Sequence, residues 1–471
     1  MNGTRSFLGA CAAFFVFSAS CFSAAPNVGP LPPLEFHPPE PERIVLKNGL
    51  IVYLLEDHEL PLVSLTLRMK TSPADEPGNR PGLFGFMGEV WRSGGTSSRT
   101  PEVLNEELEG MAADVETGAD TESAVVSLSC LSKDLSHSMA VMKDILLHPA
   151  FRSDQLALSK AKALEGLRGK NDTPGSIAKR AFRDVIYGPT HLYARELTPA
   201  TVNPISRGDL GSLYKKVVSP EGAFINVSGD YDRADMVKAL EDLFSDWTPQ
   251  KRVVPDVDLS AIQPSTGSLF YVEKDFNQSR IVMGRVGLSR HDPDHFALEL
   301  ADYILGGGGT SRLFGQIRSR LGLAYMVGSF SIEPKGPGLA GAGCQTKAGS
   351  TVAAVRAILA EMGRFVQTEP TADEMSLAKD ATINSYVFRF NSPVQIVGER
   401  ALLEFYGYPS DYMKTYPANV AAVTPSELLR VSKRVFSPEG LKIVVVGNQK
   451  KFDEPLKNIG SVTPIPLDKI D

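Results

Sequence analysis

The sequence predicts an α+β fold made of two tandem homologous domains of about 200 residues each. Segments with alternating apolar residues, typical of strands, are interleaved with segments whose apolar residues recur every three or four positions, typical of helices. Turns compatible with hairpins join several of these segments, which favours an α+β layer architecture over a parallel doubly wound sheet. Landmarks of the first half of the chain also recur in the second half.

The first residues have the organisation of a secretory signal peptide, which we place at residues 1–24. Arg5 precedes an apolar run at residues 7–17, and small residues follow that run. The run is shorter than the roughly 20 residues that a membrane-spanning helix needs. We therefore expect an exported, periplasmic protein without a membrane span. The alternative is lipid attachment at Cys21, which follows two small residues.

Composition divides the rest of the chain into five segments. A Pro-rich lead-in at 25–41 cannot form a regular helix or a central strand. The polar segment at 248–267 contains three prolines and has the composition of an interdomain linker. We therefore expect an N-terminal domain at 42–247, a C-terminal domain at 268–450 and a tail at 451–471.

Local patterns predict the elements of the N-terminal domain. Two apolar segments flank Asn48 and Gly49, a pair that strongly favours a hairpin turn. Residues 62–69 alternate apolar and polar side chains, as a half-buried strand does. Further strands are expected at 124–131 and 223–228. Helical patterns occupy residues 81–92, 101–114, 134–147, 153–170 and 174–187.

Three landmarks of the first half recur in the same order in the second half. Residues 219–229 match residues 437–447 at an offset of 218. The other two matches are Tyr187-Gly188 with Tyr406-Gly407, and Gly94-Gly95-Thr96 with Gly308-Gly309-Thr310. Nearly constant offsets of this kind indicate a tandem duplication.

The net charge and the cysteine spacing give no sign of a nucleic-acid-binding protein or of a cysteine metal site. The formal net charge of −6 gives no general basic footprint for nucleic acid. Of the four cysteines, Cys11 and Cys21 fall in or beside the leader. Cys130 and Cys344 lie in strand-like contexts in different halves, so we expect two buried, unpaired thiols. Their spacing matches no metal motif.

Taken together, these features resemble the insulinase or pitrilysin family of zinc peptidases, in its two-domain branch similar to the mitochondrial processing peptidase. The resemblance covers nearly all of the chain after residue 41. It implies that the two domains form half of a clamshell chamber. The motifs that carry it are Asn48-Gly49-Leu50, the helix from Gly82-Leu83 to Gly94-Gly95-Thr96, the loop 306–312, Ile317-Arg318 and Gly322-Leu323-Ala324-Tyr325.

The metal motif of that family is degenerate in this chain. Active members carry H-x-x-E-H on the first helix and a distant Glu that completes the zinc site. Here Gly85 and Glu89 stand at the two His positions and Gly88 at the Glu position, and only Glu165 keeps its residue type. Two carboxylates without imidazole are a poor ligand set for catalytic zinc. We expect no intact catalytic residue and no metal or other cofactor in this chain.

Gly85 and Gly88 also lower the helix propensity of the segment, by about 1 kcal/mol each relative to Ala. Our interpretation is that they allow another helix or chain segment to approach closely. On this interpretation, packing has filled the former metal site.

The second half retains residues that the resemblance associates with substrate. It assigns a pair such as Arg318 and Tyr325 to substrate handling, since a guanidinium grips a peptide carbonyl or carboxylate and a phenol stabilises an oxyanion. The alternative is that each side chain is satisfied locally. A glycine-rich loop at this position is associated with the passage of substrate, and four of its residues are candidates: Gly306, Gly307, Gly308 and Gly309.

Three functional hypotheses follow. The first is a non-catalytic, substrate-binding subunit of an exported zinc metalloendopeptidase acting on peptides or unfolded segments. Its partner would be a homologous chain carrying H-x-x-E-H, and zinc would be bound by that chain. The second is a scaffold or peptide-binding protein with no role in proteolysis. The third is independent peptidase activity at an unrecognised site.

Overall fold

The computed structural model describes residues 38–256, 258 and 261–467. Leader predictions, including the one for Cys21, lie outside these residues. The first sheet consists of β1 Glu42–Val45, β2 Ile51–Glu56, β3 Leu62–Lys70, β4 Asp114–Ala119, β5 Ser123–Leu131 and β6 Phe224–Gly229. The second consists of β7 Leu269–Glu273, β8 Gln278–Val286, β9 Ala324–Ile332, β10 Leu339–Lys347, β11 Lys442–Gly447 and β12 Val462–Pro464.

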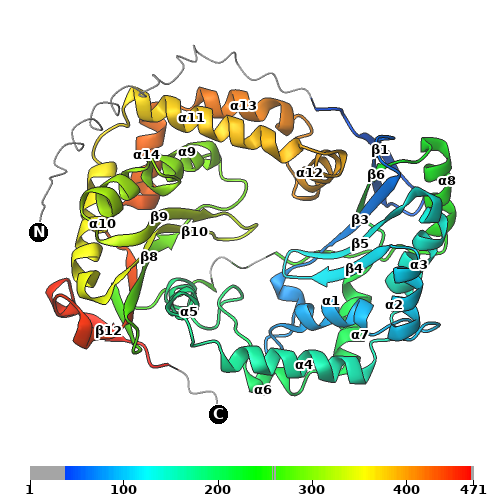
Figure 1. The fold of residues 1–471 in the computed structure, drawn as a ribbon, viewed down its shortest axis with the longest axis horizontal. Helices are drawn as coiled ribbons and strands as arrows, with labels where there is room; N and C mark the ends of the chain where they lie inside the picture. Colours follow the sequence, from blue (N-terminus) through cyan, green and yellow to red (C-terminus); the bar gives the residue numbers. More distant parts are fainter. Residues whose placement is uncertain (1–37, 257, 259–260, 468–471) are drawn as a thin grey trace, which may run out of the picture. The chain divides into compact units, whose positions relative to one another are not determined.

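Helices pack against both sheets (Figure 1). In the first half they are α1 Leu83–Ser93, α2 Pro101–Gly110, α3 Leu135–Leu147, α4 Ser153–Arg168, α5 Pro174–Tyr187, α6 Pro199–Val202, α7 Arg207–Val217 and α8 Arg233–Leu243. In the second half they are α9 His295–Gly306, α10 Thr351–Phe365, α11 Ala372–Val387, α12 Pro393–Phe405, α13 Tyr412–Ala422 and α14 Pro425–Phe436. The π-helix η4 spans Phe314–Arg320.

The strand orders confirm the predicted pair of α+β domains. The first sheet has the order β1-β2-β6-β3-β5-β4 and the second has the order β12-β7-β11-β8-β10-β9. In each sheet a late strand, β6 or β11, lies between two early ones, parallel to one and antiparallel to the other. The edge strands β1 and β12 differ, since β1 runs antiparallel to its neighbour and β12 runs parallel.

Glycines with positive φ repeat with the same spacing as the sequence landmarks. Gly222 and Gly440, one at the turn before each late strand, have φ of 69° and 73°. Gly188 and Gly407, each just after a helix, have φ of 86° and 84°. Since this backbone conformation favours glycine, the duplicated units share turn geometry as well as strand order.

Each half contributes one helix to the sheet of the other half. The apolar face of α5 packs against β8 and β11 of the second sheet, and its Phe182 meets Phe330 of β9 at 6.0 Å between ring centroids. Reciprocally, α12 packs against β2 and β6 of the first sheet, where Phe405 meets Phe224 at 5.6 Å. This exchange places residues 174–187, assigned from sequence to the first domain, in the core of the second.

Several local predictions differ from the structure. The predicted helix 101–114 ends at Gly110, and strand β4 begins at Asp114. Residues of the predicted tail form β12, which pairs with β7.

Cys130 and Cys344 are buried and unpaired, as predicted. Burial raises the pKa of the Cys344 thiol to about 12. Among the described residues, none of the helices has the length and apolar character of a membrane span.

Candidate functional site

Helix α1 carries the positions of the degenerate metal motif. Gly82, with φ of 87°, precedes the helix, and Gly94 follows it. Most of the apolar side chains between them are buried, including Trp91, whose indole N–H donates to the Ile145 carbonyl at 2.8 Å. The helix is therefore held by its apolar face. Of the motif positions, which are three and four residues apart and so share one side of the helix, Gly88 is buried whereas Gly85 and Glu89 are exposed.

Gly88, at the position of the catalytic Glu, is packed against strand β4. A Cβ atom at Gly88 would lie 2.7 Å from the carbonyl carbon of Gly118 and would also contact the Ala119 nitrogen. The Thr117 hydroxyl donates to the Gly88 carbonyl at 2.7 Å and accepts from the Arg92 amide at 3.1 Å. The segment predicted to approach α1 is thus an edge strand, and it leaves no room for a side chain at residue 88.

Gly118 and Thr117 were not identified from the sequence. Residues 114–119 mix acidic, polar and small side chains and have little strand character. A glycine in a strand facing a helical glycine is the one local signal of such a close approach.

Gly85 contradicts the packing interpretation. It is exposed, and a Cβ atom added there would meet nothing within 4 Å. The backbone at this position would accept a Cβ atom, yet the residue is glycine. Packing therefore explains the glycine at residue 88 and does not explain the one at residue 85.

The two carboxylates of the degenerate motif have different partners. Glu89 accepts a hydrogen bond from Ser159 and lies 3.5 Å from the Lys162 ammonium, both on α4. Glu165, farther along α4, is exposed and pairs with Arg168. In the part of the chain that the structure describes, no three His, Cys, Asp or Glu side chains are grouped to hold a metal ion. The residues at the motif therefore do not fit a catalytic zinc.

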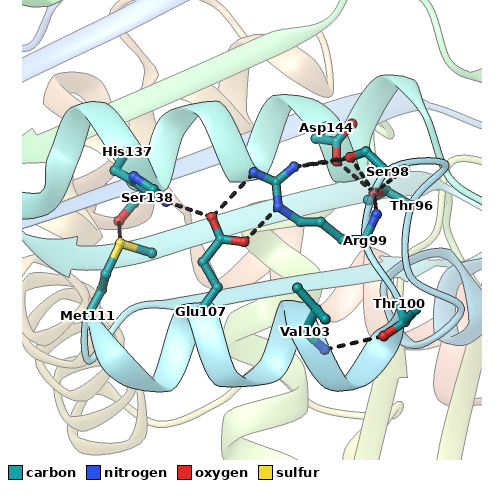
Figure 2. A network of polar contacts seen from close by, with 10 residues as sticks. All are labelled: Thr96, Ser98, Arg99, Thr100, Val103, Glu107, Met111, His137, Ser138 and Asp144. Atoms are coloured by element: carbon teal, nitrogen blue, oxygen red, sulfur yellow. Dashed lines mark hydrogen bonds and ion pairs between the residues drawn. The ribbon is translucent and has the colours of Figure 1, made fainter.

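The loop after α1 is fixed by a polar network (Figure 2). The Asp144 carboxylate of α3 accepts from Thr96 Oγ1 at 2.6 Å and from Ser98 Oγ at 2.7 Å. Arg99 donates to both Asp144 and Glu107, at 2.7 and 2.6 Å, and so connects the loop to α2 and α3. These bonds explain why the Gly94-Gly95-Thr96 landmark belongs to the framework of the fold.

In the second half, Arg318 and Tyr325 lie together. The Arg318 guanidinium carbon is 5.4 Å from the ring centroid of Tyr325 and 4.8 Å from that of Phe314, within cation–π range. Arg318 is exposed on the π-helix η4, and the Tyr325 side chain is 75% exposed. The structure brings the predicted pair together but does not test its role.

Tyr325 occupies a β-bulge. In the pairing of β9 with β10, Ala324 is opposite Thr346 and Met326 is opposite Gln345, so Tyr325 is the extra residue. Bulges redirect a side chain relative to the regular sheet, and π-helical turns are frequent at functional sites. Both residues of the pair thus come from irregular backbone, which the sequence pattern did not indicate.

The glycine-rich segment is only partly a loop. Gly306 is the last residue of α9, and a Cβ atom there would lie 2.6 Å from the Gly328 carbonyl carbon of β9. A Cβ atom on Gly307 would lie 2.6 Å from Tyr303 Cα. Gly309 has open space, and Gly308 has only the Tyr303 hydroxyl within 4 Å. Gly306 therefore belongs to a helix and not to a loop, and at both Gly306 and Gly307 a side chain would meet neighbouring backbone.

Two family models match this chain. Residues 52–192 match the model described as Insulinase (Peptidase family M16). Residues 204–382 match the model described as Peptidase M16 inactive domain. Together the two models cover more than half of the sequence, and the second match begins within the first half.

Relatives with curated names include peptidases and a non-peptidase. A protein named as an uncharacterized zinc protease from Rickettsia bellii is 26% identical over 290 residues, which are 61% of this chain and 68% of the relative. A protein named Non-peptidase homolog YmxG from Helicobacter pylori is 22% identical over 84% of this chain and 91% of its own length.

Solved structures share the fold. The structure titled as a peptidase M16 inactive domain from Pseudomonas fluorescens superposes with a TM-score of 0.77 at 23% identity, covering 91% of this chain and all of that one. The periplasmic protease PqqL from Escherichia coli gives a TM-score of 0.74 at 12% identity, covering 94% of this chain and 49% of that one. At these identities the structures establish the fold alone.

Proposed function

The chain belongs to the insulinase family, peptidase family M16, as a member without the intact metal motif, and we propose that it binds peptides without cleaving them. On this proposal it is the substrate-binding subunit of an exported heteromeric metallopeptidase. A homologous chain carrying H-x-x-E-H contributes the zinc and the general base. The substrates are peptides or unfolded segments.

The observation that carries the proposal is the exposed pair Arg318 and Tyr325 on irregular backbone. Stacking of Arg318 on the exposed ring of Tyr325 gives no hydrogen bond to the guanidinium N–H groups or to the phenol hydroxyl. Tyr and Arg are enriched among the residues that dominate binding energy at protein interfaces, so an exposed Arg–Tyr pair is a candidate recognition element. A peptide carbonyl or carboxylate would accept hydrogen bonds from both.

Strand β9 supports the same proposal. It is the outer strand of the second sheet, and besides Tyr325 it exposes Met326 and Ile332. An extended peptide adds to such a strand through main-chain hydrogen bonds, with side chains reading the ligand. Substrate binding along β9 would bring a peptide directly past Arg318.

A scaffold role without proteolysis is the second candidate function. The close contact of Gly88 with β4 favours this role. The position where a catalytic Glu would stand is occupied by packing between a helix and a strand, as in a purely structural protein. The name of the Helicobacter pylori relative, a non-peptidase homolog, agrees with either role.

The test is reconstitution with a homologous chain that carries H-x-x-E-H. Arg318→Ala and Tyr325→Phe should each reduce peptide turnover of the complex by about 10² to 10³, the usual effect of losing one transition-state donor. Complex mass and zinc content should stay unchanged, because neither residue belongs to the partner's metal site. Arg320→Ala, two residues from Arg318 on η4, is the matched control. Wild-type turnover in both variants would contradict the substrate-binding role of the pair and favour the scaffold role.

A further inference from the structure

A cavity of about 320 Å³ lies where segments of both halves meet. Lys70 enters it from the end of β3 and Glu122 from the turn between β4 and β5. Arg290 follows β8, Lys335 lies in the turn between β9 and β10, and Tyr406 follows α12. The cavity thus draws its polar groups from five separate segments, none of which belongs to the Arg318 and Tyr325 site.

The lining has more cations than carboxylates. Glu122 accepts from the Arg290 guanidinium at 2.7 Å and from the Lys335 amide at 3.3 Å, so this carboxylate is already engaged. The Lys335 ammonium pairs at 2.6 Å with Asp256, whose side chain is 84% exposed. Lys70 has no carboxylate within 4.0 Å among the described residues. Lys70 therefore has no ion-pair partner among the described residues, although its ammonium lies over the Phe224 and Phe405 rings and is attracted at longer range by Glu404.

Aromatic rings form the apolar part of the cavity. The Lys70 ammonium lies 5.5 Å from the ring centroid of Phe405, and the Arg290 guanidinium carbon lies 3.8 Å from that of Tyr406. Tyr193 also lines the cavity, and its hydroxyl accepts from the Gly336 amide at 3.2 Å. Burial, followed by repulsion from Lys335, lowers the pKa of Lys70, so the ammonium would gain from an anionic partner.

We propose that this cavity binds the C-terminal carboxylate and hydrophobic last side chain of a peptide. The carboxylate pairs with Lys70 and Lys335, and the side chain packs on Phe405 and Tyr406. This assignment rests on the proposed peptide-binding function and extends it, because it specifies a free chain end as the feature that is recognised.

A phosphate group is a weaker match to the same lining. Phosphate sites typically use a free Arg fork or several convergent backbone N–H groups. Here the single Arg is paired with Glu122 and stacked on Tyr406, and the Thr71 hydroxyl donates to the Asp120 carbonyl at 2.8 Å. The remaining groups are a lysine ammonium and aromatic rings, which suit a ligand with one negative charge and an apolar part.

The test compares N-acetylphenylalanine with its C-terminal amide, measured by calorimetry on the purified chain. The carboxylate should bind at least about tenfold more tightly than the amide, and Lys70→Met should remove most of that difference. Lys335→Met should weaken carboxylate binding less, because its ammonium has Asp256 as a partner. Lys433→Met, at an exposed lysine on α14, should leave binding unchanged.

The outcomes separate this site from the proposed function. Selective binding of N-acetylphenylalanine without binding of longer unstructured peptides would show a carboxylate site in the cavity, but it would refute the peptide-binding subunit and with it the assignment to a peptide chain end. Binding of longer peptides with equal affinity for their acid and amide forms would support the peptide-binding subunit and refute the carboxylate site in the cavity. The assignment is overturned if N-acetylphenylalanine does not bind, if Lys70→Met and Lys335→Met bind it like the wild type, or if inorganic phosphate occupies the cavity in its place.

Discussion

The two halves of the molecule share a sheet topology and differ in where a helix touches the outer strand. In the first half, α1 contacts β4 through Gly88 and Gly118, in the middle of the helix. In the second half, α9 contacts β9 through Gly306 and Gly328, at the helix end. One contact fills the position of a catalytic Glu, whereas the other leaves the outer strand exposed at Tyr325.

This difference shows that two units with the same sheet topology can place their helix contacts at different points. Strand order and turn geometry follow from the shared core, so both halves preserve them. The contact point of the helix depends on Gly88 in the first half and on Gly306 and Gly328 in the second, so it varies without a change of fold. The first half has become a packed framework, and the second half presents the surface that we propose binds peptide.

Replacing Gly88 should have the largest effect on stability. Gly88→Glu places a Cβ atom against the β4 backbone, and we expect a loss of about 3 kcal/mol or more in the free energy of unfolding. Gly85→Glu is the matched control in open space and should change stability by less than about 1 kcal/mol. Urea unfolding of both variants measures the difference. Equal stability would refute the claim that β4 closes this position.

Gly306→Ala should cost about 2 kcal/mol, because the added Cβ atom meets the β9 backbone. Gly309→Ala has room for the Cβ atom and should be nearly neutral. A destabilised Gly309 variant together with a Gly306 variant of normal stability would contradict the claim that Gly306 packs closely against β9.

A buried carboxyl in α9 makes the second half sensitive to pH. Burial raises the pKa of Asp302 to about 6, whereas the unfolded chain has a pKa of about 3.9. The folded state therefore binds this proton more tightly, and stability falls as pH rises from about 4 to about 6. Asp302→Asn should flatten that dependence and add up to about 2 kcal/mol above pH 6.

The measurement is urea unfolding at several pH values between 4 and 7.5. Asp172→Asn, at an exposed residue of the first half, is the control and should keep the wild-type dependence. An unchanged pH profile in the Asp302 variant would contradict this account of the second half.

The exchanged helix α5 offers the smallest test. The Tyr187 hydroxyl donates to the Pro337 carbonyl at 2.8 Å across the two halves, in a buried position. Tyr187→Phe should lower the free energy of unfolding by about 1 kcal/mol. Tyr303→Phe, whose hydroxyl has no hydrogen-bond partner in the described ranges, should have no effect. Equal free energies of unfolding for the two variants would show that this hydrogen bond does not stabilise the position of α5.

Local patterns were sufficient to predict most elements of the first half. The helix predicted at 81–92 is observed at 83–93, and the strand predicted at 62–69 is observed at 62–70. These elements combine clear apolar periodicity with turn residues at their ends. Strand β4 was missed because its sequence lacks apolar alternation and its position depends on pairing with β5.

Tertiary features could not be predicted in the same way. The exchange of α5 and α12 joins residues that are distant in sequence, so local patterns do not contain it. Gly85 and Gly88 are identical residues on one helix, and only the position of β4 distinguishes the open one from the packed one. The proximity of Arg318 and Tyr325 was expected from the family resemblance, but the bulge and π-helix that present them were not.

The most direct test of the central claim is an assay of the purified chain alone, with zinc content, cleavage and binding measured on one unstructured peptide. We predict far less than one zinc per chain and no cleavage, because Gly85, Gly88 and Glu89 cannot form the metal site. We also predict binding that weakens in Arg318→Ala. Stoichiometric zinc with chelator-sensitive cleavage would contradict the account.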